Sequence, residues 1–307
     1  MPMKSKLLPF LLALAILACQ SPVLATPATI TPPPSLTPAS TETLIPTAAA
    51  TETLPPAPTL TPTPPPLATR VLILSIDGLR PDAILAAPMP NLLNLMQNSA
   101  YTLDARTVFP SSTLPSHASM LTGTCPSKHG VDWNDYTPEE GYANGIDLFD
   151  LAHARGLQTV MHVGKEKLRQ ITEPSSLDIF SYVNDRDLVV TQRLLDDFPQ
   201  DFGLLFVHFP LVDGMGHVYG WMSPQQLSVA FRADEALGQI LSELDARNLR
   251  GETLIIVTSD HGGHDTTHGS SLPEDMTIPW IASGPGIHRR IRIGFTHSAR
   301  MGRSAGV

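Results

Sequence analysis

Three carboxylates follow apolar segments of this 307-residue chain. Asp77 comes after the run VLILSI, Asp213 after LLFVHFPLV and Asp260 after LIIVTS. The last two are accompanied by histidines that could share a site with them, namely His217, His261 and His268. Carboxylates and neutral imidazoles are the ligand types that borderline metals such as zinc accept. The pattern therefore predicts a metal centre.

The number of candidate ligands favours two metal ions over one. A tetrahedral site takes four ligands, whereas six candidates divide naturally into two sites. Paired metals about 3.5–4 Å apart recur in enzymes that carry out in-line displacement at phosphorus. Taken singly, an Asp before Gly commonly forms a turn, and a lone His is usually structural. Taken together, the residues predict a phosphate-ester hydrolase that uses two divalent metal ions, with zinc the best match.

The segment FPSSTLPSHASMLTG at 109–123 offers a nucleophile, Thr113, just before a short predicted helix. The free N–H groups and the positive dipole end of a helix start attract a phosphoryl group. On its own, Thr113 would simply cap the helix. Beside two metals its hydroxyl can become an alkoxide, because metal coordination lowers the hydroxyl pKa and removes the need for a separate base.

These residues need a scaffold that brings several strand ends together. Apolar runs typical of strands buried on both faces occur at 71–76, 158–163, 202–209, 253–258 and 278–282. Helical patterns separate them, including a short helix after Pro90 and a long one that starts at Ser223-Pro224. The alternation predicts an α/β fold with a doubly wound, mostly parallel sheet and helices on both faces. Ligands of such sheets lie beyond the carboxyl ends of the strands.

The same segments resemble motifs of the alkaline phosphatase superfamily and, within it, of the type I phosphodiesterase / nucleotide pyrophosphatase family. The resemblance extends from about residue 71 to 287 and rests on IDG at 76–78, FPSSTLPSH at 109–117, HGVDWN at 129–134, DGMGH at 213–217, SDHGGH at 259–264 and THG at 267–269. It implies an alkaline phosphatase-like fold. It also implies that Thr113 is the nucleophile and that Asn134 donates a hydrogen bond to a phosphoryl oxygen.

The resemblance further implies how the ligands divide. The metal that activates Thr113 would be held by Asp77, Asp260 and His261. The second metal would be held by Asp213, His217 and His268. Thr113 would then form a covalent phosphothreonine with a small phosphodiester or pyrophosphate, such as a nucleotide, and water would release the product. His264 is the rival of His268, which is favoured because the glycine after it matches short-loop members of the family.

Other functions remain open. Sulfatases carry a related segment, but they need a modifiable Cys or Ser where Thr113 stands, which disfavours that activity. Lys165 and Lys167, in GKEKLR at 164–169, resemble paired basic residues that contact the transferred phosphate in phosphomonoesterase and phosphonate hydrolase relatives. A solvated charge run would explain them equally well. A third alternative is a non-catalytic, surface-tethered binding module, which the complete set of ligands with Thr113 and Asn134 argues against.

The first residues favour export. Lys4 and Lys6 precede an apolar run at 7–17 that is too short to span a membrane, so residues 1–19 are interpreted as a signal peptide. The stretch ILAC at 16–19 resembles a bacterial lipobox, which implies a lipid anchor on Cys19. We therefore expect a lipoprotein on the outer face of the cell membrane. Cleavage after VLA at 23–25 would instead give a secreted protein.

The remaining segments define the domain organisation. Fourteen of the thirty prolines lie between residues 22 and 66, so residues 20–68 are interpreted as a disordered Pro/Thr-rich spacer. The hydrolase domain would occupy 69–307. Its last twenty residues contain five arginines and no apolar periodicity, which suggests a truncated end. The formal net charge of -9 argues against stable nucleic-acid binding.

Overall fold

The computed structural model describes residues 68–287. The predicted signal peptide, the lipid attachment at Cys19, the spacer up to residue 67 and the arginine-rich segment after residue 287 lie outside the described residues. These assignments stay predictions.

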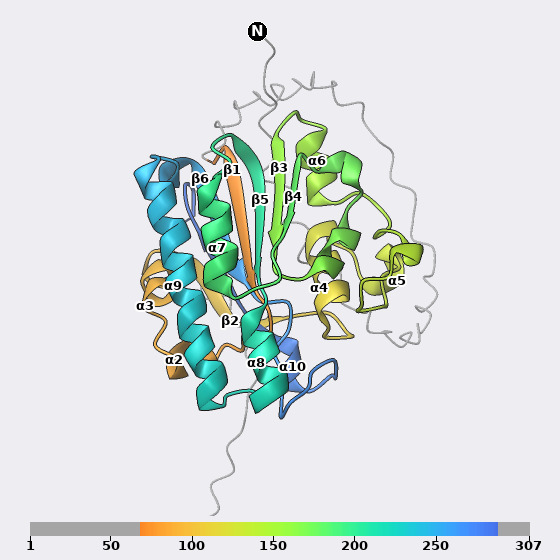
Figure 1. The fold of residues 1–307 in the computed structure, drawn as a ribbon, viewed down its shortest axis with the longest axis vertical. Coiled ribbons are helices and arrows are strands. Elements are labelled where there is room, and N and C mark those ends of the chain that lie inside the picture. The colour runs from red at the N-terminus through yellow and green to blue at the C-terminus, as the bar shows by residue number, and fades with distance from the viewer. Residues whose placement is uncertain (1–67, 288–307) are drawn as a thin grey trace, which may run out of the picture. The chain divides into compact units, whose positions relative to one another are not determined.

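Within the described part of the chain, seven strands form one sheet in the order β2-β7-β6-β1-β5-β3-β4 (Figure 1). They are β1 (Arg70–Ile76), β2 (Ala100–Arg106), β3 (Gln158–Val163), β4 (Ile179–Tyr182), β5 (Phe202–Phe209), β6 (Thr253–Thr258) and β7 (Thr277–Ser283). The pairs β1/β5, β1/β6, β3/β5 and β3/β4 are parallel, whereas β7 runs antiparallel to β6 and β2. The prediction of a mostly parallel sheet is confirmed.

The apolar runs identified five of these strands and missed β2 and β4, which lie at the two edges of the sheet. The residues of β2 are mostly half-buried, and β4 leaves Ile179 and Tyr182 exposed. An edge strand is flanked by a neighbour on one side and is covered less completely on its faces. It therefore does not need the continuous apolar run that marks the central strands.

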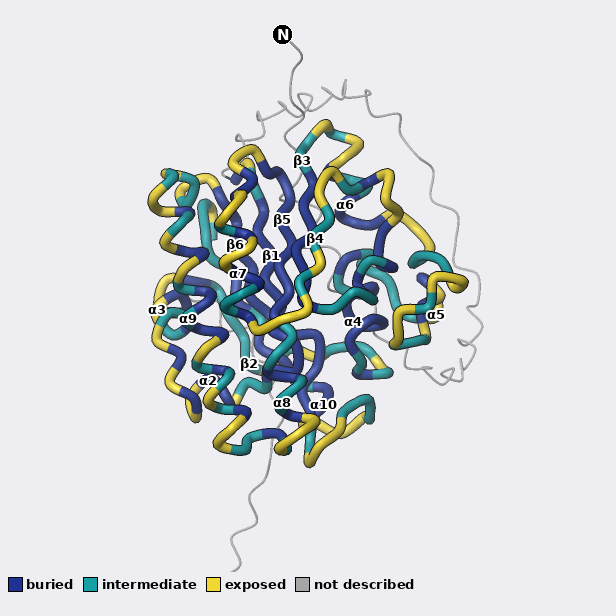
Figure 2. Tube along the Cα trace, in the orientation of Figure 1, coloured by how far each residue is buried: buried dark blue, intermediate teal, exposed yellow. Residues whose placement is uncertain are grey.

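Helices cover both faces of the sheet (Figures 1 and 2). One face packs against α2 (Ala83–Ala86), α3 (Pro90–Gln97), α7 (Asp187–Asp196) and α9 (Pro224–Ala246). The other packs against α4 (Thr113–Thr122) and α6 (Leu148–His153). Alternate residues of β1 enter the two cores, with Leu72 and Leu74 on the first side and Val71 and Ile73 on the second. The predicted α/β architecture is confirmed.

The two helices predicted from their start signals begin where the sequence indicated. The Ser223 hydroxyl accepts a hydrogen bond from the main-chain N–H of Gln226 at 3.3 Å and so caps α9. The first turn of α3 is capped from a distant segment, because the buried carboxylate of Asp234 accepts the N–H of Leu92 at 2.7 Å. These contacts join α3 to α9 over one face of the sheet.

Shorter helices and 3-10 turns connect these elements. They are α5 (Pro126–His129), α8 (Leu211–Tyr219), α10 (Pro273–Met276) and the 3-10 turns η2 (Pro138–Glu140), η3 (Glu166–Ile171), η4 (Pro174–Ser176) and η5 (Arg250–Glu252). Both α8 and α10 lie at the lower end of the sheet in Figure 1. Among residues 68–287, none of the helices has the length and apolar character needed to cross a bilayer.

Candidate active site

Asp77 and Asp260 lie side by side because they follow two neighbouring parallel strands. β1 and β6 pair in register up to Ser75 and Thr258, and each carboxylate comes two residues later. Both side chains are fully buried. Asp260 Oδ1 accepts the main-chain N–H of Gly78 at 3.2 Å, which ties the turn after β1 to the loop after β6.

Asp213 belongs to the same cluster, but it lies on a helix and not, as the sequence had predicted, directly after a strand. It does not follow a strand directly, because β5 ends at Phe209 and Asp213 is the third residue of α8. His217 stands one helical turn later on the same face, with its Nε2 3.3 Å from Asp213 Oδ1. His268, on the loop after β6, brings its own Nε2 to 3.5 Å from the same oxygen.

Four buried polar atoms in this cluster have no hydrogen-bond partner: Asp77 Oδ1, Asp213 Oδ1, Asp260 Oδ2 and His261 Nε2. His261 Nε2 lies 3.3 Å from the Asp77 oxygen, 3.4 Å from the Asp260 oxygen and 4.0 Å from the Asp213 oxygen. Burying unpaired polar atoms is costly, so their convergence on one point calls for a bound cation. The residues present therefore fit a divalent metal.

The three histidines are each held in the tautomer that a metal requires. Their Nδ1–H groups donate to main-chain carbonyls, at 3.0 Å to Thr266 for His217, 2.7 Å to Gly262 for His261 and 2.9 Å to Ser111 for His268. Nε2 is therefore the atom of each ring that can bind a metal ion. Burial and the neighbouring His261 also lower the pKa of His268 to about 4, which keeps that imidazole neutral.

The side chains fall into two groups, named here for their depth. The inner set is Asp77, Asp260 and His261. The outer set is Asp213, His217 and His268, whose ligand atoms all lie within 4.8 Å of one another. Asp213 also lies within 4.8 Å of two inner ligands, so it stands between the sets. His264 takes part in neither, because its Nδ1 pairs with Asp275 at 2.7 Å.

The electrostatic field of the cluster favours positive charge. Burial alone would raise the pKa of Asp77, but the Lys165 ammonium and two imidazoles hold it well below its usual value. Burial and the nearby Asp77 raise the pKa of Asp260. Burial would lower the pKa of His261, but the surrounding carboxylates raise it to about 9. A field that attracts a proton this strongly also attracts a metal cation.

Thr113 lies beside this cluster as the first residue of α4, with Ser112 in the N-cap position. The Thr113 side chain is fully buried, and its Oγ1 accepts a hydrogen bond from Lys165 Nζ at 3.3 Å. Asn134 is fixed next to it, because its Oδ1 accepts the main-chain N–H of Leu114 at 2.9 Å. With the Asn134 oxygen engaged in this way, the amide NH₂ group is the part of the side chain that remains to meet a ligand.

The structure gives the two lysines different positions. Lys165 Nζ lies 2.7 Å from Asp77 Oδ2 and 2.6 Å from Asp213 Oδ2, as well as next to Thr113. Lys167 Nζ instead donates to the main-chain oxygen of Asn134 at 2.6 Å. One lysine therefore enters the cluster, and the other supports the segment that carries Asn134.

Sequence reasoning missed two buried histidines behind the ligands. His208 donates from Nε2 to Asp77 Oδ2 at 2.8 Å, and His117 donates from Nδ1 to the Thr113 carbonyl at 2.7 Å while its Nε2 contacts Ser75 Oγ at 2.8 Å. Both orient groups of the site. The available signal was a histidine inside an otherwise apolar strand, in LLFVHFPLV, and another within the FPSSTLPSH segment.

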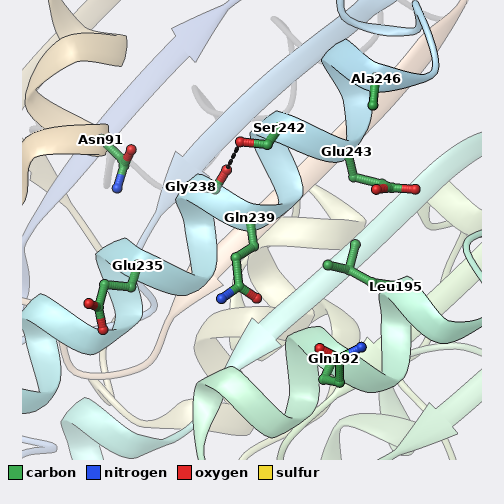
Figure 3. A pocket seen from close by; sticks show the side chains of 9 residues that line it. All are labelled: Asn91, Gln192, Leu195, Glu235, Gly238, Gln239, Ser242, Glu243 and Ala246. Carbon is green, nitrogen blue, oxygen red and sulfur yellow. Dashed lines mark hydrogen bonds between the residues drawn. The ribbon is translucent and has the colours of Figure 1, made fainter.

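A separate groove of about 660 Å³ lies on the helix layer and shares no residue with the cluster (Figure 3). Its lining comes from α3, α7 and α9 and includes Asn91, Gln192, Glu235, Gln239 and Glu243. The candidate metal ligands lie apart from this groove, beyond the carboxyl ends of β1, β5 and β6.

Solved structures share this fold. Murine ectonucleotide pyrophosphatase / phosphodiesterase 5 superposes with a TM-score of 0.61 at 17% identity, covering 72% of this chain and 89% of that one. A phosphonate monoester hydrolase from Silicibacter pomeroyi gives a TM-score of 0.54 at 15% identity, covering 72% and 69%. The chain therefore has the alkaline phosphatase-like fold, as predicted.

The family follows from the sequence. The model of the family described as type I phosphodiesterase / nucleotide pyrophosphatase matches residues 71–147 and 162–281. The chain belongs to this family, which confirms the resemblance seen in the motifs.

Curated relatives are similar over the same region. An uncharacterized pyrophosphatase/phosphodiesterase of Schizosaccharomyces pombe is 28% identical, over 62% of this chain and 44% of its own. The bis(5'-adenosyl)-triphosphatase enpp4 of Xenopus laevis is 26% identical, over 63% and 47%. Human ectonucleotide pyrophosphatase/phosphodiesterase family member 1 is 28% identical, over 62% and 23%. The matched region spans less than half the length of each of these relatives.

Proposed function

We propose that this protein hydrolyses phosphodiester or pyrophosphate bonds with two divalent metal ions, through a covalent phosphothreonine at Thr113. The observation that carries the proposal is the convergence of unpartnered, buried ligand atoms beside a threonine at the start of a helix. The inner set would hold one ion and the outer set the other, with zinc best suited to the Asp/His ligands. The ions would supply Lewis-acid activation of the nucleophile and the attacking water.

The chain's own residues position and stabilise the reacting group. Thr113 Oγ1 forms a bond to phosphorus while the bond to the leaving oxygen breaks, and water later cleaves the phosphothreonine. The main-chain N–H of Thr113, at the start of α4, and the Asn134 amide donate to the phosphoryl oxygens. The Lys165 ammonium, next to Thr113, adds positive charge where negative charge builds up.

The test compares hydroxyl groups on one segment. Thr113→Ala should bind zinc as the wild type does yet lose on the order of 10³-fold or more in turnover of an aryl phosphodiester, because it lacks the nucleophile. Thr113→Ser should keep much of the activity. Ser112→Ala is the matched control, since the Ser112 side chain makes no capping hydrogen bond to the helix. Equal damage from Ser112→Ala and Thr113→Ala would show that the nucleophile is misassigned.

A nucleotide is the substrate that the family names favour. Two of the relatives are named as a bis(5'-adenosyl)-triphosphatase and an ectonucleotide pyrophosphatase/phosphodiesterase. An inactive form of murine ectonucleotide pyrophosphatase / phosphodiesterase 5 has been solved in complex with AMP. A non-catalytic binding module is disfavoured, because the nucleophile, Asn134 and both ligand sets converge at one site. Steady-state rates on dinucleoside polyphosphates and nucleoside triphosphates would rank these substrates, and turnover of none of them would contradict the proposal.

A second function, hydrolysis of phosphate monoesters or phosphonates, is favoured by Lys165. An ammonium that reaches the nucleophile and two candidate ligands is well placed to neutralise the additional charge of a terminal phosphate. Lys165→Met should then lower kcat/KM for an aryl monoester more than for the matching aryl diester. Lys167→Met is the comparison, because that side chain donates to a main-chain oxygen. Equal losses on both substrates would leave the diesterase as the better assignment.

We also propose that the protein is exported and held at the outer face of the membrane through Cys19, on the sequence evidence alone. A single acyl chain binds only marginally, whereas several anchor stably. Cys19→Ala should release the protein from the membrane fraction. A wild-type protein found wholly in the soluble fraction would refute lipidation.

A further inference from the structure

The indole of Trp221 lies between the segments that carry the outer set. Trp221 follows α8 and is only 8% exposed. Its ring is edge-on to His217, with the ring centres 5.2 Å apart, and edge-on to His268 at 5.9 Å. One aromatic side chain thus contacts both imidazoles of the outer set.

The same residue, at the end of α8, makes hydrogen bonds to two other parts of the site. The indole Nε1–H donates to the main-chain oxygen of Gly78 at 2.9 Å, directly after the inner ligand Asp77. Its main-chain N–H donates to the oxygen of Asp265 at 2.7 Å, on the loop that carries His268. Trp221 therefore connects the turn after β1, the end of α8 and the loop after β6.

Two glycines show how closely the ring is enclosed. A Cβ at Gly216 would lie 2.8 Å from the Trp221 ring, and one at Gly263 would lie 2.2 Å from it. Neither glycine has a positive φ, so backbone conformation does not require glycine at either position. The space that a methyl group would need is occupied by the indole instead.

Of the histidine ligands, His217 needs such support most, because it is the most exposed. The His217 side chain is 44% exposed, and the hydrogen bond of its Nδ1 is to a loop carbonyl. A ligand on an exposed helix end samples several orientations unless neighbours restrict it, and metal affinity depends on those neighbours. The indole, in contact with both imidazoles, supplies that restriction.

We propose that Trp221 is a positioning residue that sets the affinity and geometry of the metal ion held by Asp213, His217 and His268. The inference rests on the proposed two-metal centre. Trp221 contacts the ligands His217 and His268 and acts on the metal site only through them.

The first test measures zinc binding by the full chain in competition with a chromophoric chelator. Trp221→Leu should weaken the weaker of two zinc sites by about tenfold or more and leave the tighter site unchanged. Trp280→Leu, on β7, is the control for loss of an indole and should bind both ions as the wild type does. A wild type that binds no zinc would defeat the proposed function. A wild type with two sites and a Trp221→Leu variant with the same two affinities would overturn the role of Trp221 alone.

A second pair of variants leaves Trp221 in place and does not depend on the stability of Trp221→Leu. Gly216→Ala favours the helix by propensity, but its methyl group must displace the indole. Gly214→Ala lies on the same helix with open space around its Cβ position. Gly216→Ala should weaken the same zinc site about tenfold, and Gly214→Ala should not. Equal affinities in the two variants would overturn the proposal.

Discussion

The inner and outer ligand sets are built by different means. The inner ligands follow β1 and β6, two central strands paired in register, and their side chains are fully buried. The outer ligands come from α8 and from the loop after β6, and the His217 side chain is nearly half exposed to solvent. One set is positioned by the hydrogen-bond ladder of the sheet, and the other by side-chain packing.

This difference affects how tightly each set binds its metal ion and how readily that ion exchanges with solvent. A strand end buried in a parallel sheet can move little without breaking ladder bonds, so the inner set is preorganised. The outer set depends on carbonyl partners in a loop and on the Trp221 ring. We therefore expect the inner ion to be held tightly and the outer ion to exchange more readily.

Ligand substitution should give the largest contrast. Asp77→Asn should reduce kcat/KM by about 10³-fold or more, because it removes a buried charge beside the nucleophile, and added zinc should not restore the activity. His217→Ala should cost at least about tenfold less and recover partly in excess zinc. The measurement is kcat/KM for an aryl diester across zinc concentrations, with circular dichroism to verify folding. If the two variants lost the same activity and added zinc restored neither, the inner and outer sets would not differ in how they hold their ions.

When the metals are removed, the outer ion should leave before the inner ion. In excess chelator, zinc release from the wild type should occur in two phases, with the outer ion leaving at least about tenfold faster. The reason is that solvent and chelator reach His217 directly, whereas the inner atoms are covered. Stopped-flow absorbance with a chromophoric chelator records both phases. A single phase carrying both ions would contradict the predicted difference in access.

The sequence predicted the inner set well because one physical rule governs it. Apolar runs identify central strands, and polar residues directly after them meet at the carboxyl edge of a parallel sheet. Asp77 and Asp260 follow that rule closely. The long helix after Ser223 and the fold class were predictable for a similar reason, since periodicity and caps are local signals.

The features that sequence analysis missed depend on contacts between distant segments. Asp213 belongs to a helix that begins soon after β5; Pro210 in LLFVHFPLVD indicates that the strand ends, but not that a helix begins. The separation of Lys165 from Lys167 is set by where Asn134 lies, and Trp221 acquires its position from glycines on two other segments. Edge strands such as β4 lack the apolar run that made the central strands visible.

The smallest expected effect concerns Asp187, whose side chain accepts a hydrogen bond at the start of α8, the helix that carries Asp213 and His217. Burial raises the pKa of Asp187 to about 7, the N–H of Leu211 on α8 opposes that shift, and Asp77 adds to it. The fold thus favours the protonated form. That stabilisation is complete below the ordinary aspartate pKa, and it is lost as the pH rises through about 7.

Asp187→Asn should therefore lose less stability than the wild type between pH 5 and pH 8, by on the order of 1 kcal/mol. The amide oxygen can still accept the Leu211 N–H. Urea unfolding at the two pH values provides the comparison, with the exposed Asp185→Asn as control. Asp147, whose pKa burial raises to about 6, adds a similar slope to every variant. An unchanged difference between the two pH values in Asp187→Asn would show that Asp187 does not cause the pH dependence.

The count of bound metal tests the central claim most directly. Elemental analysis of chelator-free, zinc-reconstituted protein should give about two ions per chain for the wild type and for Thr113→Ala. His217→Ala should retain about one, because the inner set is intact. A count near zero for the reconstituted wild type, or near two for His217→Ala reconstituted with two equivalents of zinc, would contradict a centre built from these two ligand sets.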